Sequence, residues 1–280
     1  MLDGIEGKVA LVTGAARPRS IGRATALRLA CEGAAVACLD IARPYEEFPA
    51  HGVATADDLD DVVAEIEGLG SRGLALRADV SDWQGVHEAV ARAESELGPI
   101  GLVANVAGGA GFGMGAGPLL TIGEREFEQV LDVNLKGTWI VCRATAERMV
   151  ATGTAGRIVN VSSQAGKRGF PMLGAYCAAK GGVILLTQVL ALELGASGIT
   201  VNAVCPGTVD TNLINPNGIF ASVLDQADPG GFEAWVQREI PLGRLEQADE
   251  VAAAIAYLCS DDAAYITGEA LNVSGGQTMV

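Results

Sequence analysis

Short apolar segments alternate with helical patterns along nearly the whole chain, and this alternation limits the fold more than any other feature. The first segment, Lys8–Thr13, is a continuous apolar run of the kind found in strands buried on both faces. It is followed by Ser20–Glu32, where apolar residues recur at helical spacing. This pairing repeats toward the C-terminus and predicts an α/β fold. We expect a three-layer, doubly wound, Rossmann-type arrangement with a mostly parallel, seven-stranded sheet.

The expected elements follow one another without a Pro- or Ser-rich linker, so the sequence predicts one domain over residues 1–280. Residues 206–241 are too long for a simple connector and are expected to form a substrate-binding loop or lid. The expected strands are Lys8–Thr13, Ala34–Asp40, Gly73–Ala78, Ile100–Asn105, Arg157–Ser162, Thr200–Cys205 and Ala270–Val273. The expected helices are Ser20–Glu32, Asp57–Leu69, Asp82–Leu97, Gly123–Val150, Gly174–Ala196 and Gln247–Cys259.

Charge and hydropathy exclude several classes of protein. The chain has 19 basic and 34 acidic residues, a net charge of −15, which disfavours binding to nucleic acid or to anionic membranes. The mean hydropathy is +0.30, but no apolar stretch reaches the ~18 residues that a membrane helix needs. Six scattered cysteines without a C-x-x-C pair, and no visible secretory signal, predict a reduced, cytoplasmic protein without a metal site.

The turn after the first strand has the composition of a phosphate-binding turn. Gly14 and Gly22 permit a sharp turn and a close approach of pyrophosphate, and the helix that starts near Ser20 offers free N–H groups. Asp40 ends the second strand, where a carboxylate binds ribose hydroxyls and repels a 2′-phosphate, which favours NAD. Arg17, with Arg19 and Arg43, keeps NADP as the alternative. An ordinary βα turn and a solvated strand end are the simpler explanations.

Three polar residues suggest acid–base chemistry near the centre of the expected sheet. Tyr176 and Lys180 are four residues apart in an expected helix, so their side chains share one face. The chain has only four lysines and four tyrosines, which makes this spacing uncommon by chance. Ser163 follows an expected strand, at the edge where parallel sheets bind ligands. A nearby ammonium would favour the phenolate of Tyr176, as removal of a proton from an alcohol requires. A surface Tyr–Lys contact is the simpler explanation.

These motifs occur in order with others along nearly the whole chain: Thr13-Gly14 to Gly22, Asn105 to Gly108, Asn134, Ser163, Tyr176 with Lys180, and Pro206-Gly207. Together they resemble the short-chain dehydrogenase/reductase family in its single-domain, NAD(P)-dependent form. The resemblance implies that Tyr176 is the acid–base, Lys180 lowers its pKa and holds the nicotinamide ribose, and Ser163 binds the substrate oxygen. It implies that Asn134 distorts its helix and positions a relay water; a helix-interior Asn bonded to its own backbone is the alternative.

The resemblance also implies a set of cofactor contacts and an assembly. The expected cofactor-binding residues are Gly14, Arg17, Ser20, Ile21, Gly22, Asp40, Asp79, Val80, Asn105, Ala107, Gly108, Tyr176, Lys180, Pro206, Gly207 and Thr208. Family members commonly pack the two long helices across a twofold axis, which implies a homodimer or homotetramer. The glycine-rich turn departs from the family pattern, because two residues are inserted and Ser20 replaces the middle glycine.

The substrate is less constrained by the sequence. Lys167 and Arg168 closely follow Ser163 and could attract an anionic substrate group; a solvated surface pair or an interface ion pair is the alternative. Amide and aromatic groups in the expected lid would suit a polyol, a sugar or a cyclic alcohol; they are Asn212, Asn215, Asn217, Phe220, Phe232 and Trp235. A hydrolase is disfavoured, since no G-x-S-x-G motif is present. A dehydratase or epimerase and a non-catalytic NAD-binding protein remain alternatives to an oxidoreductase.

Overall fold

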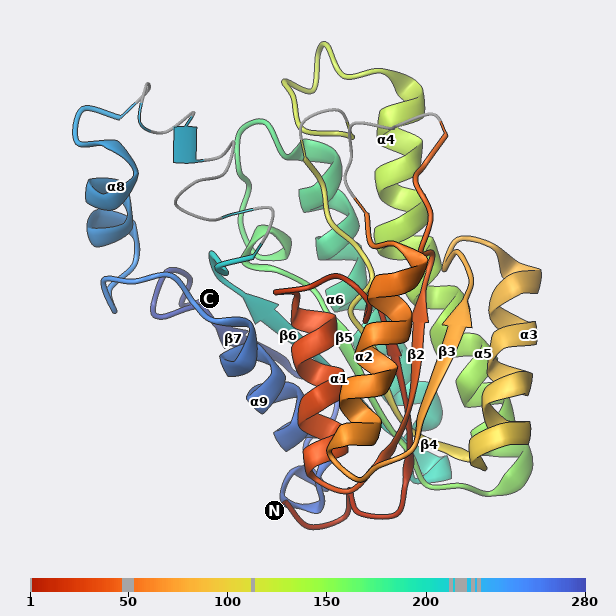
Figure 1. Cartoon of the computed structure of the whole chain (residues 1–280). Coiled ribbons are helices and arrows are strands. Elements are labelled where there is room, and N and C mark those ends of the chain that lie inside the picture. The colour runs from red at the N-terminus through yellow and green to blue at the C-terminus, as the bar shows by residue number, and fades with distance from the viewer. Residues whose placement is uncertain are drawn as a thin grey trace.

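One parallel sheet of seven strands forms the centre of the molecule (Figure 1). The structure is a computed structural model that describes residues 2–46, 53–111, 114–211, 214, 221–222, 225 and 228–280. The strands lie in the order β3-β2-β1-β4-β5-β6-β7, and every neighbouring pair is parallel. Their bounds are β1 Val9–Thr13, β2 Ala35–Asp40, β3 Gly73–Arg77, β4 Ile100–Asn105, β5 Arg157–Val161, β6 Thr200–Pro206 and β7 Ala270–Val273. The predicted fold class is therefore confirmed.

Helices cover both faces of this sheet, which explains why its strands are apolar throughout. Along β1, Leu11 packs into the core on one face and Val12 into the core on the other. One layer consists of α1 (Ile21–Cys31), α2 (Ala56–Gly68) and α9 (Ala248–Cys259). The opposite layer consists of α3 (Trp83–Leu97), α5 (Gly137–Thr152) and α6 (Gly174–Leu194). Short 3-10 turns lie at Gln164–Gly166 (η2), Gly195–Ser197 (η3) and Asp261–Ala263 (η4).

Two departures from the predicted elements lie near the carboxyl edge of the sheet. The helix expected over 123–150 is divided into α4 (Glu124–Leu131), a π-helical segment η1 (Asp132–Lys136) and α5. Within 206–241, expected to be irregular, residues Gly231–Glu239 form α8, which stands apart from the two layers in Figure 1. The four-residue spacing of Phe232 and Val236 explains α8, because both side chains are buried in one small apolar cluster.

Among the described residues, Gly174–Ser197 is the one stretch with the length and apolar character of a membrane span, contrary to our expectation that none exists. Core helices of soluble proteins pass the same test. Here Ala179, Val183 and Ala191 are buried in the fold, while Leu185 and Leu192 are 64% and 85% exposed. The helix thus has one face in the core and one apolar face outside it.

A buried polar network crosses the sheet below its carboxyl edge. The Asn105 amide in β4 donates to Asn160 Oδ1 in β5 at 2.8 Å and to Cys142 Sγ in α5 at 3.1 Å. The Asn160 amide in turn donates to Thr187 Oγ1 in α6 at 2.9 Å. Asn105, predicted to contact the cofactor, is 3% exposed and its side chain points into this network. It therefore links two strands beneath the cleft instead of lining it.

Candidate active site

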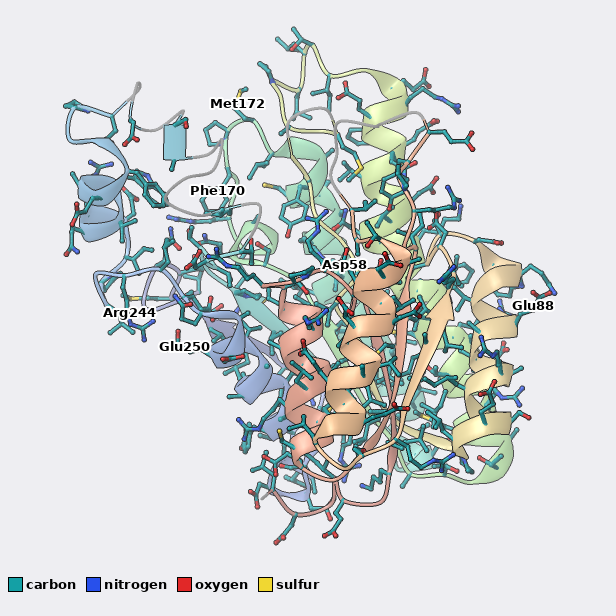
Figure 2. All side chains as sticks on the ribbon, viewed as in Figure 1. Asp58, Glu88, Phe170, Met172, Arg244 and Glu250 are labelled. Atoms are coloured by element: carbon teal, nitrogen blue, oxygen red, sulfur yellow. The ribbon has the colours of Figure 1, made fainter. Side chains whose placement is uncertain are left out.

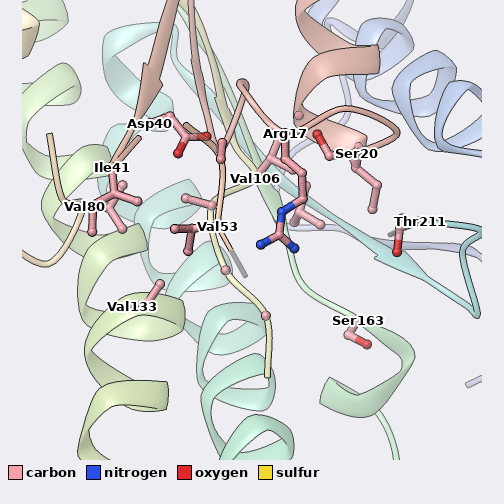
Figure 3. A pocket seen from close by; sticks show the side chains of 18 of the residues that line it. Arg17, Ser20, Asp40, Ile41, Val53, Val80, Val106, Val133, Ser163 and Thr211 are labelled. Atoms are coloured by element: carbon pink, nitrogen blue, oxygen red, sulfur yellow. The ribbon is translucent and has the colours of Figure 1, made fainter. Parts of the chain in front are cut away.

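A cleft of about 260 Å³ opens at the carboxyl edge of the sheet, where β1, β2, β4, β5 and β6 end. Figure 3 shows Asp40 and Ser163 at opposite ends of it, with the Arg17 side chain pointing into the space between them. Most of the predicted site residues line this cleft. They are Gly14, Arg17, Ser20, Ile21, Gly22, Asp40, Asp79, Val80, Ala107, Gly108, Ser163, Tyr176, Lys180, Pro206 and Gly207.

The glycine-rich turn brings the start of α1 directly against the end of β1. A Cβ on Gly22 would lie 2.0 Å from the carbonyl oxygen of Gly14, so only glycine fits there. Gly14 has φ +67 and packs on the backbone of Ala107. Ser20, which replaces the family glycine, caps α1 by accepting a hydrogen bond from the Arg23 N–H at 3.1 Å. The insertion therefore leaves a helix N-terminus facing the cleft, and this cradle fits a pyrophosphate.

Asp40 and Arg17 form the charged end of the cleft. The two Asp40 oxygens accept hydrogen bonds from the backbone N–H of Ala16 (3.0 Å) and of Ala42 (3.2 Å). These bonds fix the carboxylate, which is 8% exposed, at the tip of β2. Burial lowers the pKa of the Arg17 guanidinium, although Asp40 opposes the shift. A fixed carboxylate and a nearby guanidinium give this end one group suited to ribose hydroxyls and one suited to phosphate.

The opposite end of the cleft contains Ser163, Tyr176 and Lys180. Ser163 follows β5, and the other two project from the first turns of α6. The Ser163 hydroxyl is hydrogen-bonded to the Tyr176 phenol. Lys180 Nζ lies 5.6 Å from the centroid of the Tyr176 ring and donates to the carbonyl oxygen of Val161 at 2.8 Å. The three side chains predicted to carry the chemistry therefore meet at one place.

Burial shifts the pKa values of both Tyr176 and Lys180. Burial raises the pKa of Tyr176 to about 12, although its hydrogen bond with Ser163 acts in the opposite direction. Burial lowers the pKa of Lys180, which is 2% exposed, to about 8. Without a further positive charge, Tyr176 is therefore a protonated phenol at neutral pH. It is then able to donate a proton, and its deprotonation depends on charge that enters the cleft.

Asn134 lies in the middle of the π-helical segment, behind the cleft wall. Its side-chain amide donates to the carbonyl oxygens of Val130 (2.9 Å) and Gly109 (2.8 Å), and its Oδ1 accepts from the Gly109 N–H (2.8 Å). The helix is thus distorted here as the resemblance implied, and the side chain also bonds its own helix, as the alternative stated. Asn134 reaches the cleft through Gly109, which lines it.

The segment after β6 forms the wall near Ser163. Pro206, Gly207, Val209 and Thr211 line the cleft there. Arg19, at the tip of the inserted turn, pairs across the opening with Asp210 at 2.7 Å. The two walls of the cleft are thus connected by an ion pair that the sequence analysis missed, because its partners are 191 residues apart.

Comparisons with known proteins agree with this geometry. Residues 14–278 match the family model described as Enoyl-(Acyl carrier protein) reductase. The (-)-trans-carveol dehydrogenase of Rhodococcus erythropolis is 36% identical, over 98% of this chain and 99% of the relative. The cyclohexanol dehydrogenase of Rhodococcus sp. (strain TK6) is 38% identical, over 98% and 97%. The crystal structure of carveol dehydrogenase from Mycobacterium avium in complex with NAD matches at a TM-score of 0.88 and 32% identity, covering 97% of this chain and 98% of that chain.

This chain belongs to the short-chain dehydrogenase/reductase family. The family resemblance stated from the motifs is confirmed, and so is the prediction of an oxidoreductase acting on a CH–OH group. The structure adds cleft-lining residues that no family motif marked. They include Ile41, Tyr45, Gly109, Met114, Val133, Thr211 and Ile214. Most of them lie in loops, which carry no periodic signal, so their place in the cleft was not visible in the sequence.

Some predicted contacts of this short-chain dehydrogenase/reductase lie outside the cleft. Lys167 Nζ donates to the carbonyl oxygen of Ala270 at 2.7 Å, and the Arg168 guanidinium lies 4.5 Å above the Phe170 ring. Neither cation lines the cleft, so the structure does not support an anion site there. Thr208, expected beside the nicotinamide, is turned away and donates from its hydroxyl to Gln277 Oε1 at 3.0 Å.

The aromatic groups expected in the lid are also placed elsewhere. Phe232 and Trp235 stack with ring centroids 6.2 Å apart in the apolar cluster around α8, and neither lines the cleft. The remaining lid residues of the prediction, Asn212, Asn215, Asn217 and Phe220, lie outside the described residues. Within the described part of the chain, no group of three or more His, Cys, Asp or Glu side chains could hold a metal ion.

Proposed function

We propose that this chain transfers a hydride between a nicotinamide cofactor, NAD in preference to NADP, and a secondary alcohol or its ketone. The observation that carries the proposal is the meeting of Ser163, Tyr176 and Lys180 at one end of a cleft whose other end holds Asp40. A bound dinucleotide would reach both ends of the cleft, because the pyrophosphate joins its adenosine ribose to its nicotinamide. In this proposal, the backbone N–H groups at the start of α1 bind that pyrophosphate.

The proposed chemistry needs one proton moved at the substrate oxygen. A bound nicotinamide supplies the hydride acceptor and, when oxidised, a positive charge that lowers the pKa of a nearby phenol. Ser163 holds the substrate oxygen, and Tyr176 takes its proton in oxidation or donates it in reduction. Lys180 adds a positive charge beside the Tyr176 ring and binds the nicotinamide ribose. Asn134 acts as a positioning residue, which its hydrogen bonds to Gly109 support.

The preference for NAD rests on Asp40. Its carboxylate is fixed by two backbone N–H groups at the end of β2, where it would accept ribose hydroxyls and repel a 2′-phosphate. Arg17 would favour a phosphate, but it lies between the two ends of the cleft in Figure 3. The similar crystal structure of carveol dehydrogenase from Mycobacterium avium is a complex with NAD, which supports the same preference.

We further propose a cyclic secondary alcohol as the substrate class. The lining of the cleft includes Met114, Val209 and Ile214, which offer apolar contact and no hydrogen bonds from their side chains. Such a wall suits a hydrocarbon ring better than a polyol, whose hydroxyls would lose their water. Carveol and cyclohexanol, which name two relatives of this chain, are cyclic alcohols of this kind.

We propose that the chain forms one domain over residues 1–280, with 206–241 as its substrate-binding loop, and assembles as a cytoplasmic homodimer or homotetramer. The exposed apolar face of α6, with Leu185, Val189 and Leu192, supports an assembly. The six cysteines are free, which supports a reducing compartment. Size-exclusion chromatography with light scattering tests the assembly, and a monomer at micromolar concentration would contradict it.

The test of the function is a panel of alcohols with NAD, read by the absorbance of NADH. Cyclic secondary alcohols are expected to turn over, and Tyr176→Phe is expected to lower kcat by about 10²–10⁴-fold while NADH binding is kept. Tyr257→Phe, an exposed position on α9, is the matched control. NADH binding without turnover of any alcohol would favour the non-catalytic alternative. Normal turnover by Tyr176→Phe would refute the assignment of the acid–base.

A further inference from the structure

Glu246 is a buried carboxyl group behind the cleft wall, and none of the roles described above uses it. The residue is 8% exposed. Its Oε2 accepts a hydrogen bond from the Gly207 N–H at 3.0 Å, while Oε1 is buried without a hydrogen-bond partner. Unpaired buried carboxylates are costly, so such a group needs a reason to be where it is.

The backbone of Glu246 is joined to the same wall. Its N–H donates to the Thr208 carbonyl at 3.0 Å, and its carbonyl accepts from the Asp210 N–H at 2.8 Å. These bonds form a parallel bridge between Val209 and Glu246. The Gly207 N–H is shared, since it also donates to the Val273 carbonyl at 2.9 Å. Glu246 is therefore hydrogen-bonded to Gly207, Thr208 and Asp210 of the wall segment that follows β6.

No cation neutralises Glu246 within the described residues. Arg244 is the nearest positive group, but its two terminal nitrogens donate to the two oxygens of Glu250, at 2.8 and 2.6 Å. Figure 2 shows Arg244 and Glu250 together at the edge of the molecule beside α9. Glu246, Arg244 and Glu250 line a second cavity, of about 240 Å³. Its other lining residues are uncharged; they are Thr208, Ile240, Leu242, Asn272, Val273, Ser274 and Gly275. Glu246 therefore lies near the negative charge of Glu250, while the positive charge of Arg244 is already paired with Glu250.

From this arrangement we infer that Glu246 is a positioning residue, whose ionisation strengthens its hold on Gly207 and thereby increases the affinity of the cleft for the nicotinamide cofactor. The inference rests on the proposed function. An ionised acceptor makes a stronger hydrogen bond than a neutral one, so the wall segment is better fixed when Glu246 is charged. Burial and Glu250 raise the pKa of Glu246 to about 8, and this change of charge falls in an accessible pH range.

The sign of the effect on folding is opposite to that on binding. The pKa of Glu246 is about 8 in the folded chain and about 4.3 in an unfolded one. Between these values the folded state binds the extra proton, so stability relative to a non-titrating variant is greatest at low pH. This contribution is lost as the pH rises to about 8. Cofactor affinity is expected to rise over the same upper range, a combination that a residue important only for packing would not produce.

The experiment compares the wild type with Glu246→Gln, Glu246→Leu and the exposed control Glu233→Gln, between pH 6 and 9.5. NADH affinity is measured by fluorescence titration, and thermal midpoints are measured without cofactor. For the wild type and the control, affinity is expected to rise about three- to tenfold through pH 8. Glu246→Gln keeps an acceptor and is expected to bind without that rise. Glu246→Leu is expected to bind weakly at every pH.

Two further comparisons separate Glu246 from other groups. Lys180 also has a pKa of about 8. Its effect on the pH dependence of NADH affinity is the same in the wild type and in Glu246→Gln, so it cancels in the ratio of their affinities. Glu250→Gln removes a repelling charge and releases Arg244, so it is expected to move the midpoint of the ratio to lower pH. Identical pH profiles for the wild type and Glu246→Gln would overturn the inference. If no variant binds NADH, the proposed function fails, while the pH dependence of thermal stability still tests the titration of Glu246.

Discussion

Gly22→Ala tests whether the close contact between α1 and β1 holds the cofactor turn in place. The added Cβ would lie 2.0 Å from Gly14 O and 2.6 Å from Gly14 C, both backbone atoms. Contacts below 3.0 Å do not persist, so the helix or the strand must move by about an ångström. Overpacking of this kind costs about 1–3 kcal/mol, whereas the better helix propensity of alanine returns less than about 1 kcal/mol. We expect a net loss of stability.

Gly68→Ala is the matched control, because Gly68 is also helical and nothing lies within 4 Å of its added Cβ. It is expected to be neutral or slightly stabilising. In urea unfolding, Gly22→Ala is expected to lie below this control by about 1–3 kcal/mol. Its affinity for NADH is expected to fall at least about tenfold, since the displaced N–H groups at the start of α1 no longer face the pyrophosphate. Equal stability and equal NADH affinity in the two variants would refute the steric reasoning.

Three other substitutions test separate contacts. Asp40→Asn removes the charge that disfavours a 2′-phosphate, so the ratio of NADPH to NADH affinity is expected to rise at least about tenfold in thermal-shift titrations; an unchanged ratio would contradict selection by Asp40. Arg19→Ala breaks the exposed ion pair with Asp210, which is worth about 0.2–1 kcal/mol, so stopped-flow release of NADH is expected to accelerate by at most about fivefold and to lose its salt dependence. The double variant Lys167→Ala/Arg168→Ala is expected to keep the KM of the wild type, and a large increase would restore the anion site that the structure does not support.

The sequence was sufficient for the fold because both of its signals are local. Continuous apolar runs such as Lys8–Thr13 require cover on two faces, and the helical patterns between them provide it. The three residues Ser163, Tyr176 and Lys180 were also accessible, since one strand end and one helix turn place them. In each case, neighbouring residues in the chain determine the geometry.

The predictions that the structure changed depend on where a side chain turns after its backbone is placed. Lys167 is close to Ser163 in sequence, yet its amine reaches a carbonyl of β7. Thr208 follows the cleft-lining Gly207, but its hydroxyl bonds Gln277 near the C-terminus. Glu246 reads as a surface residue before α9, and only the folded chain brings it beneath Gly207. Such contacts join distant segments, and no spacing rule reports them.

The network of Asn105, Asn160 and Thr187 has a consequence for how the chain finds its structure. Apolar strands buried on both faces are nearly interchangeable along their length, so a parallel pairing that slipped by a residue would still bury hydrocarbon. A slip of β5 against β4 would instead separate the two asparagine amides and leave them without partners in a dry interior. The hydrogen-bonded asparagine pair thus favours one register of β5 against β4 over the neighbouring registers. Gly108 and Ser163 follow these two strands, so this register also sets their relative positions at the edge of the cleft.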